Sequence, residues 1–384
     1  FSAAWRVSEE AFMKDLKWIS NFKVRFGWGI VGNDRISNYL SLDMYSNIKY
    51  GIGNNTVTVL TPKQLKNSDL KWEGSSTVNL GLDLGFFDNR LNLTADFFIK
   101  NTKDLLLAQS LAHATGFSSQ WQNIGKIQNR GIELSITSTN IQTKDFTWNT
   151  NFNISFIRNE LKALADGASH MYARSGFDSN FTGYDYIAKV GESLGLIYGY
   201  EFDGVYQYDD FYTDTNGNLV LKPGITQNSR YSKDKKVGAR PGVTKYKDQD
   251  GDGDITTNDR TVIGNAAPDF TGGWNNTFTY KGFDLTVFMN FSVGNDVFNM
   301  STQRFVGPYL ANQNTISDMA NRYTLIDPLT GKESTNLARL AELNPGEDNG
   351  SRMWNISSNN KYAISDHSSY YIENGSFLRL NTIT

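Results

Sequence analysis

Five aspartates in one short stretch are the residues of this chain whose types and spacing could do chemistry. They lie in the segment 247–259, KDQDGDGDITTND, and are Asp248, Asp250, Asp252, Asp254 and Asp259. Their spacing fits a calcium loop, in which positions one, three and five offer carboxylates, position seven offers a carbonyl and position twelve closes the site. A hard cation takes about six to eight oxygen ligands and would relieve the repulsion between these carboxylates. The segment therefore predicts a structural Ca²⁺ site.

The same stretch is also typical of a solvated turn rich in Asp and Gly. Glutamate usually closes a calcium loop, whereas this chain has Asp259 at position twelve. Neither flank has the helical periodicity of an EF-hand, and Lys245, Lys247 and Arg260 could balance the carboxylates without a metal. Both interpretations stay open, and each gives the segment a structural role.

No other residues of the chain have the spacing of a catalytic site. The three histidines, His113, His170 and His367, are far apart and lack both a ligand spacing and a neighbouring nucleophile motif. The 384 residues include no cysteine, which excludes disulfides and thiolate metal sites. A net charge of -3 provides no basic field for a nucleic acid backbone. We therefore expect a protein that is not an enzyme and does not bind nucleic acid.

The elements that must position these residues are long strands, because apolar and polar residues alternate with a period of two. The segment 77–100 contains two such runs joined by the turn 87–89. The apolar face consists of Val78, Leu80, Leu82, Leu84 and Phe86 from the first run and Leu91, Leu93, Ala95, Phe97 and Ile99 from the second. The opposite face has Asn, Asp, Thr and Gly. Each run has roughly the nine to eleven residues that a tilted strand needs to cross a bilayer.

Other parts of the chain repeat this pattern, which makes it a property of the whole fold. The repeats are 21–30, 131–137, 146–156, 274–280 and 283–293. Strands of a soluble sandwich average only about five or six residues, so these runs favour an all-β, antiparallel transmembrane β-barrel. No apolar run has the length of a transmembrane helix, and no shift in composition divides the chain. We therefore expect residues 1–384 to form one part of a barrel that continues in a longer chain.

The connections between the expected strands are of two kinds. Three are short, at 87–89, 142–144 and 281–282, whereas those at about 32–76, 101–129, 158–272 and 294–375 are long and rich in Asn, Ser, Asp and Tyr. Short turns at one rim and long loops at the other are typical of outer-membrane barrels, whose short turns face the periplasm. We therefore expect the long loops, including the segment 247–259, to be extracellular.

Six phrases spread over almost the whole chain resemble, in the same order, the SusC/RagA family of TonB-dependent outer-membrane transporters of Bacteroidota. They are 1–12 (FSAAWRVSEEAF), 26–33 (FGWGIVGN), 123–133 (NIGKIQNRGIE), 190–207 (VGESLGLIYGYEFDGVYQ), 246–270 (YKDQDGDGDITTNDRTVIGNAAPDF) and 375–381 (GSFLRLN). The resemblance implies roughly the C-terminal half of a barrel of about twenty-two strands. By this resemblance, the chain would lack the signal sequence, the N-terminal plug, the TonB box and the closing strand.

The resemblance also implies a function and partners. It implies active import of nutrients, mostly oligosaccharides and sometimes peptides, across the bacterial outer membrane, where lipid surrounds the barrel. A SusD-like surface lipoprotein would cap the mouth, and TonB would act through the missing N-terminal region. No residue of this chain is thereby assigned to substrate binding or energy coupling. Two alternatives stay open: a soluble secreted calcium-binding β-protein that binds glycans, and a siderophore or cobalamin transporter without a lipoprotein lid.

Overall fold

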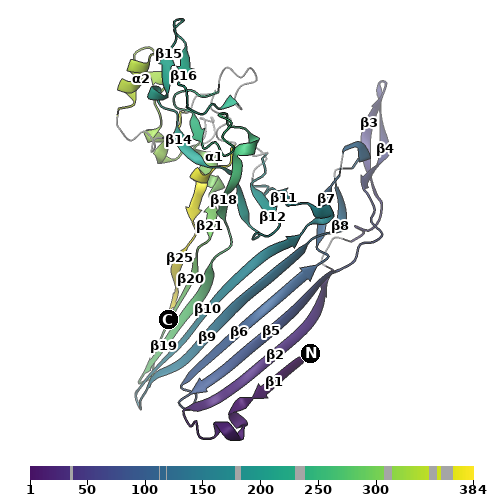
Figure 1. Cartoon of the computed structure of the whole chain (residues 1–384), viewed down its shortest axis with the longest axis vertical. Helices are drawn as coiled ribbons and strands as arrows, with labels where there is room; N and C mark the ends of the chain where they lie inside the picture. Colours follow the sequence, from purple (N-terminus) through teal and green to yellow (C-terminus); the bar gives the residue numbers. More distant parts are fainter. Residues whose placement is uncertain are drawn as a thin grey trace.

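The computed structural model of the chain has a long tilted sheet at one end and a lobe of loops and short elements at the other (Figure 1). It describes residues 1–34, 38–111, 113–117, 119–177, 183–229, 238–306, 314–345, 353–355 and 366–384. Within these residues, no helix is both long enough and apolar enough to cross a membrane.

The sheet has nine strands in the order β1-β2-β5-β6-β9-β10-β19-β20-β25. Their bounds are β1 Ser2–Arg6, β2 Ile19–Asn33, β5 Glu73–Phe86, β6 Leu91–Lys103, β9 Lys126–Gln142, β10 Phe146–Ala163, β19 Phe270–Tyr280, β20 Phe283–Val293 and β25 Phe377–Ile383. Every neighbouring pair is antiparallel and the order follows the chain. The prediction of long antiparallel strands is thus confirmed. The run expected over 131–137 is longer than predicted, because β9 pairs with its neighbours through residues 126–142.

Tight turns join the strands at the end of the sheet away from the lobe. The β5–β6 turn has three consecutive residues in the left-handed region, Phe87, Asp88 and Asn89, with φ of 54°, 58° and 60°. The β19–β20 turn has two, Lys281 and Gly282, with φ of 47° and 90°. A two-residue turn with positive φ at both positions matches the twist of the strands it joins. These turns therefore fix the register of both hairpins.

The long connections leave the sheet at its other end and carry small paired strands of their own (Figure 1). They run over residues 34–72, 104–125, 164–269 and 294–376, between the strands whose bounds are given above. The strands within them are β3 Met44–Ile52, β4 Asn55–Gln64, β7 Leu106–Ser110, β8 Ser119–Asn123, β11 His170–Ala173, β12 Tyr186–Lys189, β13 Leu196–Tyr200, β14 Phe202–Val205, β15 Phe211–Thr213, β16 Leu219–Leu221, β17 Thr244–Tyr246, β18 Arg260–Asn265, β21 Asp296–Phe298, β22 Ile326–Asp327, β23 Lys332–Glu333 and β24 Ile372–Asn374. Within the described residues, the short α-helices α1 Met300–Phe305 and α2 Leu337–Leu343 accompany them.

The buried core lies mainly in the lobe, by which we mean the described residues of 196–265 and 295–374. Its largest cluster packs Trp354, Tyr323 and Tyr371 against Leu340 of α2 and Val306. Each of these five side chains is at most 2% exposed. The strands of the long sheet contribute few buried side chains. The lobe thus has the packing of a globular unit, whereas the sheet leaves both of its faces uncovered in the described part of the chain.

Candidate functional site

One face of the long sheet is an apolar surface that nothing covers in the described part of the chain. Leu80 on β5 lies opposite Phe97 on β6, which in turn lies opposite Ile132 on β9. These side chains are 46%, 43% and 46% exposed. A contiguous apolar surface of this kind marks contact with a membrane or another protein. An outward band of alternating apolar residues is what a barrel strand presents to lipid.

The other face of the sheet is polar, and its strongest feature is a group of four charged side chains. Arg25 on β2 donates to both oxygens of Asp83 on β5, at 2.9 and 3.0 Å, and to Asp96 on β6 at 3.0 Å. The Lys23 ammonium lies 3.9 Å from Asp83. The network ties three strands together across the polar face. A water-lined wall of this kind suits the interior of a transport barrel.

Gly81 makes room for this network. A Cβ atom at Gly81 would lie 2.6 Å from the Arg25 guanidinium carbon and 2.7 Å from Asp96 Oδ1. The sequence placed these residues on the polar face but did not show that they meet. The turn at 87–89 sets Gly81 opposite Asp96. This register could have been read from the sequence, and it would have indicated that the two residues are neighbours. The pairing of β2 with β5 crosses a connection of about forty residues, so local sequence carries no signal for it.

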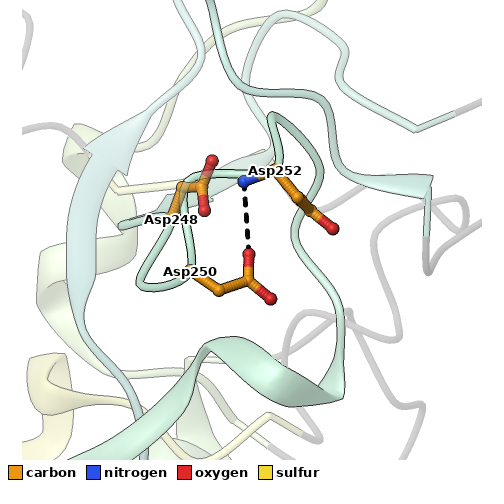
Figure 2. A group of neighbouring side chains, drawn as sticks. All are labelled: Asp248, Asp250 and Asp252. Carbon is orange, nitrogen blue, oxygen red and sulfur yellow. Dashed lines mark hydrogen bonds between the residues drawn. The ribbon is translucent and has the colours of Figure 1, made fainter.

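The Asp-rich loop brings three of its five predicted ligands together (Figure 2). One carboxylate oxygen from each of Asp248, Asp250 and Asp252 lies within 4.8 Å of the other two. Asp248 accepts from the N–H groups of Gly251 and Gly253, at 2.6 and 2.8 Å. The hydrogen bond from Gly253 is the main cause that lowers the pKa of Asp248 below its ordinary value. The loop thus presents three carboxylates, with Asp248 held in its charged form.

The carboxylates of the other two predicted ligand residues bind groups of the protein. The Asp254 carboxylate accepts hydrogen bonds from the backbone and hydroxyl of Ser229. Asp259 is fully buried and accepts from the N–H groups of Gln249 and Thr256, at 2.8 and 2.7 Å. Both therefore fix the loop to its surroundings, while the first three carboxylates remain together at the surface.

The histidines lie in separate environments. His170 stacks edge-on against Tyr172, with ring centroids 4.9 Å apart. His367 is buried, and its Nδ1 lies 3.3 Å from Oε1 of Gln303. The side chain of His113 lies outside the described residues. The two described imidazoles therefore contact different neighbours and pack against them.

Comparison with known proteins identifies the sheet. The family model described as TonB dependent receptor-like, beta-barrel, matches residues 5–232. The chain is 37% identical over 321 residues to TonB-dependent receptor P3 of Formosa agariphila, covering 84% of this chain and 30% of the relative. It is 29% identical over 391 residues to TonB-dependent receptor SusC of Bacteroides thetaiotaomicron, covering 99% and 33%. The chain thus spans about a third of the length of these relatives.

Solved structures share the fold. The RagAB peptide importer in its closed-closed state matches with a TM-score of 0.71 and 21% identity, over 100% of this chain and 36% of that one. A structure of the RagAB peptide transporter matches with a TM-score of 0.70 and 22% identity, over 100% and 36%. These matches and the match to SusC confirm the resemblance inferred from sequence. The chain belongs to the TonB-dependent receptor β-barrel family, a family of outer-membrane transporters rather than enzymes.

Proposed function

We propose that the whole protein imports nutrients, oligosaccharides or peptides, across the bacterial outer membrane with energy supplied through TonB. The observation that carries the proposal is the two-faced sheet: its strands other than β1 and β25 are long enough to span a bilayer, with apolar residues exposed on one face and the Arg25 network on the other. Family membership leaves the alternative of a soluble glycan-binding protein without support. TonB would act through parts of the protein outside this chain.

Uptake by a deletion strain tests this proposal. Cells that lack the gene should lose growth on one class within a panel of oligosaccharides and peptides, and the full-length gene should restore it. The same class should fail to support growth in cells that lack TonB. Unchanged growth of the deletion strain on every member of the panel would contradict the proposal.

We propose in addition that a SusD-like surface lipoprotein caps the long-loop end. This partner separates nutrient import from the alternative of a siderophore or cobalamin transporter, which would work without a lid. Purification of the full-length protein in mild detergent should bring the lipoprotein with it. Recovery of the transporter alone, together with binding of a siderophore or cobalamin, would favour the alternative.

The lobe would lie outside the cell under this proposal, because long loops of outer-membrane barrels are extracellular. Lys222 lies exposed in the lobe and Asp88 lies in the short turn at the opposite end of the sheet. In intact cells, a membrane-impermeant thiol reagent should label Lys222→Cys and spare Asp88→Cys. The reverse pattern would invert the proposed orientation.

The Asp-rich loop would bind Ca²⁺ in a structural role. Three convergent carboxylates support this proposal, because Asp248, Asp250 and Asp252 could supply three of the oxygen ligands of a hard cation. Asp254 would add its backbone carbonyl and Asp259 would close the site, as the spacing predicts, and the carboxylates of both also hold the loop in place through Ser229, Gln249 and Thr256. A bound cation would stiffen the loop without taking part in any reaction.

A further inference from the structure

A cavity of about 600 Å³ lies within the lobe. Its described lining residues belong neither to the nine-stranded sheet nor to the Asp-rich loop. Phe211, Leu219 and Val243 supply apolar surface, and all three belong to one packed cluster. Ligand pockets commonly have volumes of about 300–1,000 Å³ and combine an apolar lining with a few placed polar groups. The cavity therefore has the size and the lining of a site for a small molecule.

Arg240 is the positive group of this cavity. It is half-buried, and its side chain makes no hydrogen bond or ion pair within the described part of the chain. A partly desolvated charge without a partner is unfavourable, and proteins normally pair it. A planar guanidinium offers paired donors that match a carboxylate. An incoming carboxylate would supply the partner that the described residues do not give Arg240.

The backbone at Arg240 is fixed before any ligand arrives. Residues 240–243 form a turn in which Val243 N donates to Arg240 O at 3.1 Å, and Gly242 has a φ of 80°. Pro at the second position and Gly at the third are the residues that a type II turn requires. Gly242 N also donates to Tyr206 O at 2.7 Å, and a Cβ at Gly242 would lie 2.6 Å from the Tyr323 ring. The backbone part of the ordering cost of binding is therefore absent at Arg240.

Glu333 is the negative group that lines the same cavity. It is exposed at the end of β23, and it forms no ion pair with Arg240 in the described structure. The β22–β23 hairpin that carries it is fixed to α2, because Arg339 donates to both oxygens of Asp327 at 2.9 and 3.0 Å. Two opposite charges thus line one cavity without neutralising each other.

We propose that this cavity binds a short peptide in its zwitterionic form, with the carboxylate on Arg240 and the ammonium group toward Glu333. The apolar side of the cavity would take small side chains, and the hydroxyl groups of Ser334 and Thr335 and the amide of Asn218 line it as hydrogen-bonding groups. A neutral saccharide lacks both charges, and an acidic saccharide would satisfy Arg240 while facing Glu333. The site lies on the lobe itself, so its occupancy does not depend on transport.

Calorimetric titration of the purified full-length protein in detergent tests the proposal. The ligands are trialanine with free ends, its C-terminal amide, its N-acetylated form and a neutral glucose trisaccharide. Free trialanine should bind, amidation should weaken binding by about tenfold or more, acetylation should weaken it less because Glu333 is exposed, and the trisaccharide should not bind. Absence of trialanine binding, or equal binding of trialanine and its amide, would overturn the proposal.

Matched variants test which charged side chain binds each end of the peptide. Arg240→Gln should abolish the difference between trialanine and its amide, and Arg240→Lys should retain part of it. Glu333→Gln should remove the effect of acetylation. Lys222→Gln and Asp209→Asn change the same charges at exposed positions of the lobe outside the cavity lining, and should bind as the unmodified protein does. Controls that weaken binding as much as the cavity variants would overturn the assignment.

Two further measurements distinguish effects on binding from effects on folding and on transport. Each variant should retain the unfolding temperature of the unmodified protein, because Arg240 and Glu333 have no partners in the described structure to lose. Binding by a protein that supports no uptake would contradict the transport proposal and leave the site intact. Uptake without any binding of trialanine would overturn the proposed binding site and leave the transport proposal intact.

Discussion

Gly81 determines where the guanidinium of Arg25 can lie on the polar face of the sheet. A methyl group at this position would occupy the space between Arg25 and Asp96, as the 2.6 and 2.7 Å approaches show. We expect Gly81→Ala to expel the guanidinium and to lower the free energy of unfolding by about 1–2 kcal/mol, because two half-buried carboxylates lose their partner. Urea unfolding of the full-length protein in lipid vesicles measures this change.

Gly29→Ala is the matched control, since Gly29 lies on β2, the strand that carries Arg25 and pairs with β5, and a Cβ there would meet no atom within 4 Å. It should leave the stability nearly unchanged. In the double variant Gly81→Ala, Arg25→Ala, the two effects should not add, because both remove one network. Full additivity, or equal effects of the two glycine substitutions, would contradict this explanation.

The three converging aspartates make a second prediction at the residue scale. Ca²⁺ should raise the unfolding temperature of the full-length protein relative to EDTA, because a ligand that binds only the folded state stabilises it. Asp250→Asn should remove most of this increase. Asp214→Asn is the control, because Asp214 also accepts backbone hydrogen bonds, from Asn216 and Asn218, but lies outside the carboxylate group.

The calcium proposal fails if EDTA and Ca²⁺ give the same unfolding temperature, in which case the loop is the solvated turn that the sequence also allowed. It fails equally if Asp214→Asn removes the increase as completely as Asp250→Asn does.

Among the elements, β13, β21 and α1 meet around His367. The His367 carbonyl accepts from Tyr200 N at 2.8 Å, and the imidazole lies edge-on to Phe298 at 5.3 Å and beside Gln303 of α1. Burial lowers the pKa of His367 below its ordinary value, and the nearby charges are Asp185 and Asp366, which oppose the shift, and Arg260, which adds to it. The imidazole is therefore neutral in the folded lobe at neutral pH.

A lowered pKa makes the stability of the lobe depend on pH in one direction. The unfolded chain binds a proton at about pH 6.5, while the folded lobe takes it up only at lower pH. The contribution of His367 to the free energy of unfolding is complete above about pH 6.5. It is lost as the pH falls below that value, by at most about 1.4 kcal/mol per pH unit. Limited proteolysis should therefore cleave the lobe more readily as the pH falls from 7.5 to 5.

His367→Gln should flatten this pH profile, whereas His170→Gln should retain it because His170 is exposed. A protein with His367→Gln that keeps the full acid sensitivity would show that another group is responsible.

The long strands and their turns were predictable because their signals are local. Alternation over 77–100 located β5 and β6, and residues 281–282 located the β19–β20 turn. The position of the first three aspartates was also predictable, since a loop of this spacing converges through its own backbone. The contact of the Asp254 carboxylate was not predictable, because its partner Ser229 lies twenty-five residues earlier in the chain and offers two donors. No local pattern reveals such a contact.

The lobe could not be predicted from the sequence for the same reason. Its core joins Val205, Tyr323 and Trp354, which are widely separated in the chain and follow neither a helical nor a strand period. Its strands contain mostly two to five residues, too few for alternation to be visible. The cavity beside Arg240 depends on bringing β15–β16, the turn at 240–243 and β23 together. Such an arrangement is a property of the tertiary fold.

On the scale of the whole molecule, two kinds of packing divide the chain. The lobe is stabilised by its own buried aromatic core, whereas the sheet exposes apolar residues on one face and ion pairs on the other. Such a sheet is stable only where its apolar face meets an apolar medium, because a large exposed apolar surface is unfavourable in water. The surrounding lipid thus completes the fold of the sheet, and the polar face is left for water.

Spin labels on single cysteines of the full-length protein in lipid bilayers test this division most directly. Labels at Leu80→Cys, Leu82→Cys and Phe97→Cys should collide readily with dissolved oxygen, which concentrates in lipid, and poorly with a water-soluble nickel chelate. Labels at Asn79→Cys and Ser135→Cys, on the opposite face, should show much less oxygen contact. A period of two in oxygen accessibility along β5 is the predicted result. Equal accessibility of both faces to the nickel chelate, with no enrichment of oxygen at Leu80 and Leu82, would contradict the account.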